Sequence, residues 1–417
     1  MRAAIEGVEP TRLVERHLQG GLSSGLVSVL AVGKAAVPMA LGACRSLRER
    51  IVRGRVIAPD LGGEPRLPHL LTFLPGDHPI PTARSERAGR EALAFADQTG
   101  PDGILLFLVS GGASALMAVP ADGVSLDDKQ RTTARLLKAG VTIHELNTVR
   151  KHLSAVKGGR LAAATAAVVR TLAISDVVDD DPAVIGSGPT VPDASTFADA
   201  LAIVRRTGGP PAYPASVIDR LERGAAGDGS ADETPKPGDA RLTRGVWTLI
   251  GGRHDAMRAA ADEARRRGFA VHVREAPVVG EARDAAAAWA RWLRDVATSP
   301  GPQCVVSSGE TTVTVRGSGK GGRNQEFALA LVEALRGIPR SVAVASIGTD
   351  GVDGPTDAAG ALVRSDSAAR AEAGGLPPPS HFLAANDAYA YFDALGDLLR
   401  TGPTGTNVGD VQVGLIR

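Results

Sequence analysis

Residues 103–117 read GILLFLVSGGASALM, and this stretch decides the fold class. The six residues from Ile104 to Val109 are all apolar, which is typical of a short strand buried on both faces of a sheet. The letters SGG then supply a turn, and a helical run begins at Ala113. A buried strand, a glycine turn and a helix in succession favour a parallel α/β sheet.

The same alternation recurs along the chain. Leu26 to Val32 leads into an Ala-rich helix from about Ala35, and Thr171 to Ile174 ends at an acidic loop. Residues 208–244 are rich in Gly and Pro and are interpreted as a linker. Further strand-like runs follow it, at Val246 to Ile250, Ala270 to Val273 and Val342 to Ile347. We therefore predict an α/β protein of two domains, residues 1–237 and 238–417, each a largely parallel sheet flanked by helices.

Composition narrows the class of partner. The chain has 417 residues, 43% of them apolar, so it can bury sizeable cores. A net charge of +1 and an aromatic content of 3% give no reason to expect nucleic acid, and no apolar run approaches the ~20 residues of a membrane span. Two distant cysteines, Cys44 and Cys304, fit a reducing compartment. We expect small-molecule partners and a cytoplasmic location.

Lysine is rare, with seven among 47 basic residues. Four of the seven, Lys34, Lys151, Lys157 and Lys320, lie beside glycines or polar motifs, which nominates them for sites that need a compact ammonium. Lys34 follows a glycine in or just before the first turn of a predicted helix, where the helix dipole disfavours a cation. An anionic ligand there would offset that cost, although a solvated lysine is the alternative.

The turn after Val109 is a candidate anion site. Backbone N–H groups of Ser110, Gly111 and Gly112 can form a concave nest for phosphate. A serine-hydrolase elbow would need glycine where Leu116 stands, so we exclude it. A tight turn without a ligand remains the alternative.

A basic helix and its loop form a second candidate. Asn147, Arg150 and Lys151 lie within two turns of helix, and KGGR follows at residues 157–160. These side chains could bind an anionic substrate, or they could simply form a solvated face.

Acidic and amide side chains follow several strands and nominate further binding groups. Carboxylates in such loops can hold Mg²⁺ or accept a proton from a hydroxyl, and they can also cap turns. The spacing of an EF-hand is absent. The binding candidates in these loops are Asp176, Ser187, Gly188, Asp350, Asp353 and Asn407. Among them, Asp176 and Asp350 are the candidate metal ligands.

Residues 315–327, VRGSGKGGRNQEF, contain the spacing G-x-G-x-x-G after a strand-like run. A dinucleotide-binding turn also requires an acidic residue about 20 positions later at the end of the next strand, and that position falls near residues 339–341, before the strand. A Walker A loop fails as well, because Thr314 and Gly321 stand where Gly and Ser/Thr are required. We interpret the loop as a phosphate cradle that uses Lys320, Gly322 and Arg323.

Eight stretches in fixed order, spanning nearly the whole chain, resemble the glycerate 2-kinases of the MOFRL-containing type. That resemblance implies a Rossmann-like N-terminal domain, a C-terminal α/β domain with the MOFRL region at about residues 300–410, and an active site between them. It also implies transfer of the γ-phosphoryl group of ATP to the 2-hydroxyl of D-glycerate with Mg²⁺ or another divalent cation. The stretches are VGKAAVPMA, LVSGGASAL, LNTVRKHLSAVKGGRLA, SDVVDDDPAVIGSGPTVPD, ETTVTVRGSGKGGRNQEFALA, GTDGVDGPTDAAGA, NDAYAYFDAL and TGPTGTNVGD.

The resemblance assigns catalytic roles to Lys34, Asp176 and Arg323. Cations can clamp the charge that spreads over the transferred phosphoryl group, while Asp176 orients or deprotonates the acceptor. Asp179 departs from the family pattern and adds negative charge near the predicted phosphate path. Two alternatives stay open, an NAD(P)H-dependent hydroxypyruvate reductase and an inactive binding protein. A homodimer is compatible with either.

Overall fold

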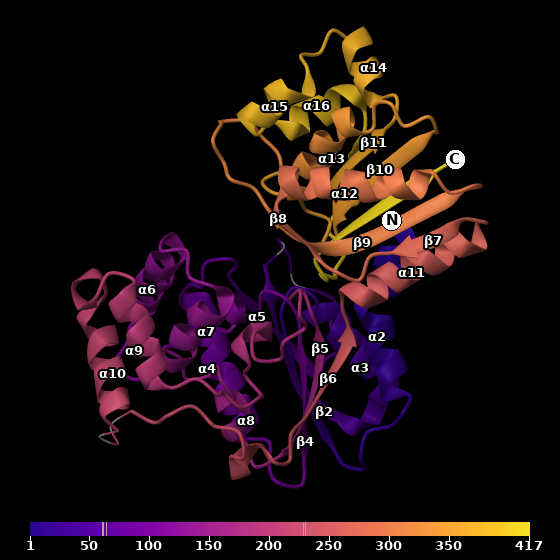
Figure 1. The fold of residues 1–417 in the computed structure, drawn as a ribbon. Coiled ribbons are helices and arrows are strands. Elements are labelled where there is room, and N and C mark those ends of the chain that lie inside the picture. Colours follow the sequence, from indigo (N-terminus) through magenta and orange to yellow (C-terminus); the bar gives the residue numbers. More distant parts are fainter. Residues whose placement is uncertain (61, 64, 228, 230) are drawn as a thin grey trace. The chain divides into compact units, whose positions relative to one another are not determined.

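The structure is a computed structural model that describes residues 1–60, 62–63, 65–227, 229 and 231–417 (Figure 1). The chain forms two compact units. The first unit is Pro10–Ile250, and the second unit combines Met1–Glu9 with Gly251–Arg417. The chain thus changes unit at residues 250/251 instead of the predicted 237/238, because the strand that follows the linker joins the sheet of the first unit.

The first unit is built on a six-stranded sheet in the order β3-β2-β1-β4-β5-β6. The pairs β3–β2, β2–β1, β1–β4 and β4–β5 are all parallel, as predicted for this domain. This is the strand order of doubly wound dinucleotide-binding sheets, in which the order reverses between β1 and β4 and ligands bind beyond the carboxyl ends of the strands. The strands are β1 (Val27–Val32), β2 (Ile51–Pro59), β3 (Leu71–Gly76), β4 (Ile104–Val109), β5 (Val168–Ile174) and β6 (Val246–Gly251).

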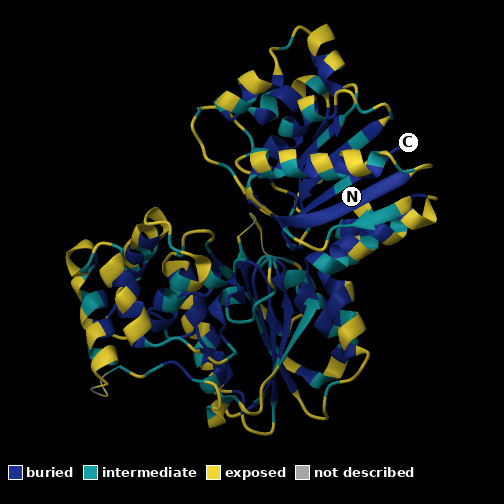
Figure 2. Ribbon diagram, viewed as in Figure 1, coloured by how far each residue is buried: buried dark blue, intermediate teal, exposed yellow. Residues whose placement is uncertain are grey.

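Helices cover both faces of this sheet. Strands β1 and β4 are buried along their full length, as their unbroken apolar sequences predict (Figure 2). Helix α3 packs against β1 and β2, while α4 contacts β2 and β3 and packs on the side chains of Leu105 and Phe107. The sheet-flanking helices are α2 (Pro10–Leu18), α3 (Ala36–Leu47), α4 (Ala83–Asp97), α5 (Ala113–Leu116) and α8 (Arg160–Ala163).

Four further helices of the first unit pack around a core of their own, which includes Leu136, Val149 and the fully buried Leu221. Helix α7 starts at a capping box, in which Thr142 accepts the Glu145 amide and Glu145 accepts the Thr142 amide. The helices are α6 (Leu126–Lys138), α7 (Ile143–His152), α9 (Phe197–Arg206) and α10 (Ala215–Ala226). Short 3₁₀ turns are η1 (Arg48–Arg50), η2 (Ile185–Ser187), η3 (Pro210–Ala212) and η4 (Ala240–Leu242).

The second unit has a seven-stranded sheet, ordered β12-β11-β10-β13-β9-β7 with β8 also paired to β9. Its strands are β7 (Ala270–Val273), β8 (Val278–Glu281), β9 (Gln303–Thr312), β10 (Val342–Gly348), β11 (Gly360–Arg364), β12 (Leu398–Leu399) and β13 (Asp410–Ile416). Most of the pairs are antiparallel, so the prediction of a largely parallel sheet is wrong for this unit. Only β7 and β8 pair with β9 in parallel, and the crossover that this requires is supplied by helix α12. The loop between β10 and β11 contains no helix, and the two strands pair antiparallel.

Helices α12 and α13 lie over one face of this sheet and α11 over the other (Figure 1). Trp289 of α12 is fully buried and its indole N–H donates to Ser307 Oγ at 2.8 Å. Helix α1 joins this unit, since a Cβ on Gly7 would lie 2.3 Å from the Ala259 Cβ of α11. No described helix is long and apolar enough to cross a membrane. The helices are α1 (Arg2–Gly7), α11 (Arg253–Arg266), α12 (Ala282–Ala297), α13 (Arg323–Ala334), α14 (Ser367–Ala373), α15 (Pro379–Ala385) and α16 (Ala388–Leu395).

Candidate functional site

In the first unit, the loops after β1 and β4 interlock at the point where the strand order reverses. The Lys34 amide donates to the Gly111 carbonyl at 2.8 Å, and the Ala35 amide donates to Ser110 Oγ at 3.0 Å. Gly33 has a φ of +132°, and a Cβ there would lie 2.2 Å from Ser110 Oγ. The Ser110 hydroxyl therefore fixes the chain between Lys34 and the start of helix α3.

Asp176 and Lys34 both lie against the Gly111–Gly112 turn. A Cβ on Gly111 would lie 2.1 Å from Asp176 Oδ2, and a Cβ on Gly112 would lie 3.4 Å from the Lys34 Cγ. Gly112 also has a φ of +83°, which favours glycine. The structure thus brings together Lys34, Ser110, the two glycines and Asp176, which the sequence had nominated separately.

His78 is a residue of this region that sequence analysis missed. A Cβ on Gly112 would lie 3.1 Å from the His78 Cδ2 and 3.4 Å from its Nε2. His78 lies two residues after Gly76, the last residue of β3, so the available signal was its place close to the end of a strand. An imidazole beside this turn can donate to an anion or move a proton.

The three predicted binding residues of helix α7 make different contacts. Asn147 is buried and accepts from Ser187 Oγ at 3.0 Å, while Arg150 Nη1 reaches Asn147 Oδ1 only at 3.5 Å. Lys151 pairs with the buried Asp193 at 3.2 Å, so its charge is neutralised within the protein. Gly188 accepts the Gly159 amide at 2.7 Å and so ties the KGGR loop to η2.

Arg323 of the second unit is held by two carboxylates. Its Nε and Nη2 donate to Asp410 at 2.7 and 2.9 Å, and its Nη1 donates to Glu310 at 2.7 Å. Burial opposes the charge, but Asp410 and Glu310 outweigh it and hold the pKa of Arg323 above its usual range. Asp410 also accepts from Asn324 at 2.9 Å. The guanidinium is therefore fixed in orientation, with two N–H groups left over.

Asp353 caps helix α13. Its carboxylate accepts the amides of Asn324 and Gln325 at 3.0 and 2.8 Å, and burial raises its pKa to about 6. A Cβ on Gly322 would lie 2.3 Å from Asp353 Cγ, so Gly322 is needed for this contact. The N-terminus of α13 is thus occupied by a protein carboxylate.

The glycine loop of residues 315–322 packs backbone to backbone on the α15–α16 junction. The amides of Arg316 and Gly317 donate to Asn386 Oδ1 at 2.7 and 3.0 Å, and the Lys320 amide donates to Asp387 Oδ1 at 3.0 Å. A Cβ on Gly317 would lie 2.2 Å from the Ala385 carbonyl oxygen. These glycines have a structural cause, and the loop offers fewer amides to a phosphate than the cradle interpretation assumed.

Two other predicted residues shape loops at the same end of the second sheet. Asp350 Oδ1 accepts the Val352 amide at 3.2 Å, and Asn407 Oδ1 accepts the Gly409 amide at 3.2 Å. The Lys320 ammonium lies 4.1 Å from the centroid of the Tyr389 ring. Glu310 and Asp410 lie within two of the family-like stretches, but neither was predicted to be a site residue.

The carboxylates allow a simple test for a bound metal. Within the described ranges, no group of three or more acidic, His or Cys side chains is placed to hold an ion. Mg²⁺ that arrives with a nucleotide needs only one or two carboxylates beside phosphate oxygens and waters. Asp176, against the Gly111 turn, fits such a role in the first unit, and Asp350 is the matching candidate in the second.

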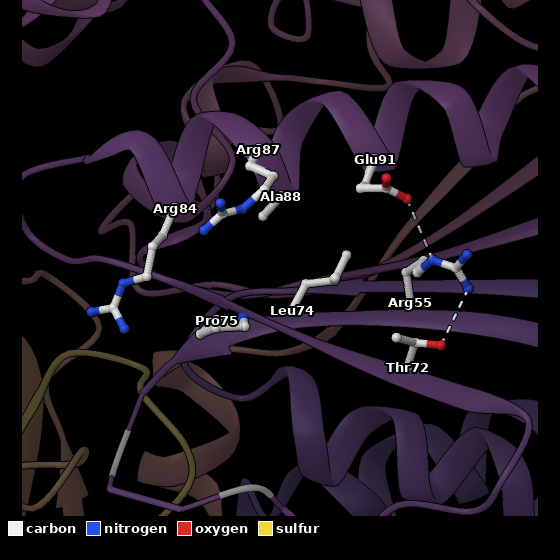
Figure 3. Close-up of a pocket in the computed structure, with 8 residues that line it drawn as sticks. All are labelled: Arg55, Thr72, Leu74, Pro75, Arg84, Arg87, Ala88 and Glu91. Atoms are coloured by element: carbon white, nitrogen blue, oxygen red, sulfur yellow. Dashed lines mark hydrogen bonds and ion pairs between the residues drawn. The ribbon is translucent and has the colours of Figure 1, made fainter.

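A cavity of about 270 Å³ lies elsewhere on the first unit, between β3 and α4 (Figure 3). Two of its three arginines are engaged, because Arg55 pairs with Glu91 at 3.9 Å and Arg84 pairs with Asp77. The cavity contains none of the predicted site residues, so it does not compete with the turn after β4.

Family models match most of the chain. A model described as a domain of unknown function (DUF4147) matches residues 1–222, and the MOFRL family model matches residues 303–410.

Full-length relatives carry two kinds of name. A D-glycerate 2-kinase of Thermotoga maritima is 39% identical over 100% of this chain and 96% of its own length. A protein of Agrobacterium vitis with a provisional hydroxypyruvate reductase name is 39% identical over 99% of this chain and 92% of its own. The crystal structure of a glycerate kinase from Thermotoga maritima matches with a TM-score of 0.88 at 38% identity, covering 100% of this chain and 97% of that one.

Proposed function

This chain belongs to the glycerate kinase family, and from that premise we propose that it transfers the γ-phosphoryl group of ATP to the 2-hydroxyl of D-glycerate. The observation that carries the proposal is the full-length similarity to a D-glycerate 2-kinase, joined to Lys34 and Asp176 at one turn beyond β4. Cations and a carboxylate beside glycine amides are what phosphoryl transfer to a hydroxyl requires. The products are 2-phosphoglycerate and ADP.

The first unit supplies the groups for the acceptor. Asp176 orients the 2-hydroxyl and accepts its proton as the new O–P bond forms and the bond to the β-phosphate oxygen breaks. Lys34 and the amides of Gly111 and Gly112 lower the energy of the charge that spreads over the transferred phosphoryl oxygens. Asn147, Arg150 and Lys151 remain the proposed acceptor groups of helix α7, with Arg150 favoured because Lys151 is neutralised by Asp193.

The second unit supplies an oriented cation and its supporting loops. Asp410 fixes the guanidinium plane of Arg323, whose remaining N–H groups can contact phosphate oxygens. Lys320 adds a second cation, while Asn407 is proposed to donate through its amide. Ser187 and Gly188 of the first unit stay among the proposed nucleotide contacts. A divalent ion such as Mg²⁺, when bound with ATP, neutralises phosphate charge, and Asp176 or Asp350 would hold it.

A reductase is the second candidate, since one relative carries that name. A reductase needs a proton donor beside the nicotinamide, but His152 of α7 is fully buried, with Nδ1 at 2.7 Å from the Thr148 carbonyl oxygen and Nε2 at 2.8 Å from Glu233. Both ring nitrogens are thus engaged, which leaves this ring no role toward a nicotinamide.

The proposal also concerns setting and assembly. Cys44 and Cys304 are unpaired thiols, which supports the cytoplasm as the location. A homodimer is the proposed assembly, and light scattering on the purified protein measures it directly.

The test of function is a kinetic comparison of variants. Wild type, Lys34→Ala, Asp176→Asn and Arg323→Ala are assayed with D-glycerate, ATP and Mg²⁺, and in parallel with hydroxypyruvate and NADH or NADPH. We expect ADP release in wild type and a fall in kcat of at least about 100-fold in each variant. Nicotinamide oxidation without ADP release would replace the kinase by the reductase.

A further inference from the structure

Three cations of the first unit lie close together without a carboxylate partner. Lys129 of α6 and Lys157 are buried, and Arg150 of α7 is half-buried. Throughout the described ranges, no acidic side chain comes within ion-pair distance of any of the three. Burial first, then Arg150 and Lys129, lower the pKa of Lys157 well below its ordinary value. Burial and Arg150 likewise lower the pKa of Lys129 to about 7, against an opposing effect of Glu86.

Such an arrangement is costly for the fold. A buried charge is expensive unless it is paired, and like charges nearby add to the cost. Lys151 shows the ordinary solution, because its ammonium meets the carboxylate of Asp193 at 3.2 Å. An anion bound near the three unpaired cations would supply what the protein itself withholds.

A hydrogen-bond chain leads from Lys157 to Arg150. Lys157 Nζ donates to the carbonyl oxygen and the Oγ of Ser114 at 2.8 and 2.9 Å. Ser114 Oγ hydrogen-bonds Ser187 Oγ, and Ser187 Oγ donates to Asn147 Oδ1 at 3.0 Å. Arg150 Nη1 lies 3.5 Å from the same Asn147 oxygen. Because Ser114 is the second residue of α5, the chain starts directly behind the Gly111–Gly112 turn.

Ser187 is held in a strained conformation. Its φ is +64°, between Gly186 at +60° and Gly188 at +64°, and its side chain is fully buried. A left-handed conformation is unfavourable for a residue with a side chain and persists only where surrounding contacts impose it. The hydrogen bonds to Ser114 and Asn147 are those contacts, and strain of this kind is concentrated at ligand sites.

We propose that Lys157 is a positioning residue for an oxyanion subsite of the first unit, where Arg150 makes the direct contact to a substrate carboxylate or phosphate. Through Ser114 and Ser187 the Lys157 ammonium fixes the residues that line the subsite. A bound anion favours the protonated form of Lys157 and of Lys129, so both lysines gain positive charge when the ligand binds. The inference rests on the proposed kinase function for the identity of the ligand, which is either the carboxylate of glycerate or a phosphate of ATP.

The test uses the opposite signs that the proposal predicts for stability and affinity. Lys157→Met removes a buried amine that has no carboxylate partner, so we expect the melting temperature to stay unchanged or to rise by up to about 4 °C. The same variant should raise one KM about tenfold, with a smaller change in kcat. A rise in the KM for D-glycerate identifies the carboxylate as the ligand, and a rise in the KM for ATP identifies a phosphate.

Lys129→Met is the matched control, because Lys129 is also buried but donates only to the Val119 carbonyl oxygen, at 3.3 Å. It leaves the serine chain intact, so the same KM should rise less than in Lys157→Met. Ser114→Ala should raise that KM as well, and the double variant with Lys157→Met should be no worse than the more affected single variant. Ser114→Ala decides the question if Lys157→Met does not fold.

The outcomes are distinct. Unchanged KM values in both Lys157→Met and Ser114→Ala would overturn the proposal, as would a lower melting temperature with unchanged affinity, which marks a merely structural lysine. If wild type shows no kinase activity, the proposed function fails, and thermal shifts with D-glycerate, ATP or inorganic phosphate then test the subsite alone. An anion-induced shift in wild type that is lost in Lys157→Met supports it, and an equal shift in both contradicts it.

Discussion

Arg323 of the second unit and Lys157 of the first unit are held in opposite ways. In the second unit Arg323 is held by Asp410 and Glu310, so its charge is offset and its orientation is fixed. In the first unit Lys157 donates to two oxygens of Ser114 and has no carboxylate partner within the described ranges, so burial lowers its pKa. A paired cation contributes geometry, whereas an unpaired buried one is fully protonated only when an anion binds beside it. The comparison therefore predicts which substitutions weaken the fold and which weaken the ligand.

The largest effect is expected where the pairing of the second unit is broken. Asp410→Asn removes a fully buried carboxylate and leaves the half-buried Arg323 without its main partner, which should cost about 3 kcal/mol of unfolding free energy. Urea unfolding measures this cost. Glu310→Gln is the matched control, since Glu310 is 44% exposed and its pair should contribute less than about 1 kcal/mol. Equal losses in the two variants would remove the distinction between anchor and exposed partner.

The first unit contains its own example of pairing. Lys151→Met strands the buried Asp193, which should cost about 3 kcal/mol, whereas Lys157→Met should cost nothing. The two lysines lie six positions apart in sequence, so one set of urea titrations compares them. If Lys157→Met proved as destabilising as Lys151→Met, the contrast between the units would be lost.

The turn after β4 gives the next prediction. A Cβ at Gly111 would lie 2.1 Å from Asp176 Oδ2, so Gly111→Ala must displace that carboxylate. A misplacement of about 1 Å can cost roughly 100-fold in rate. We expect kcat to fall by about that factor while the melting temperature changes by only a few degrees. Gly100→Ala is the matched control, because Gly100, like Gly111, has no left-handed φ but has open space around it.

A smaller effect concerns pH in the second unit. Burial raises the pKa of Asp353 to about 6, so the folded state binds a proton that the unfolded state releases near pH 4. Between those values stability falls as pH rises, and Asp353→Asn removes this contribution. The stability difference between wild type and the variant should thus be larger at pH 4.5 than at pH 7.5, by roughly 1–2 kcal/mol. A difference that grows with rising pH would contradict the assignment.

Sequence patterns predicted the first unit well because the signals that specify its strands and turns are local in the sequence. Apolar runs such as Ile104–Val109, each followed by glycine and a helix, specify parallel strands and place ligand loops at their carboxyl ends. The turn that gathers Lys34 and Asp176 follows from that rule, and the similarity to a solved glycerate kinase confirms the two-domain α/β class.

The second unit was harder because its decisive contacts are distant in sequence. Strand β13 at the end of the chain inserts between β9 and β10, and no local pattern announces that pairing. It carries Asp410 to Arg323, 87 positions away. For the same reason the position of α1 could not be predicted, because α1 packs against helix α11, which is distant in sequence. The glycine loop was interpreted as a phosphate cradle, but its glycines are required by close packing against the α15–α16 junction.

The most direct test of the account is to identify the product. Purified wild-type protein is incubated with D-glycerate, ATP and Mg²⁺, and phosphorus NMR follows the reaction. We predict that ADP and 2-phosphoglycerate accumulate in equal amounts. Accumulation of 3-phosphoglycerate would contradict the assigned acceptor hydroxyl, and ADP release without a phosphoglycerate would contradict the kinase assignment itself.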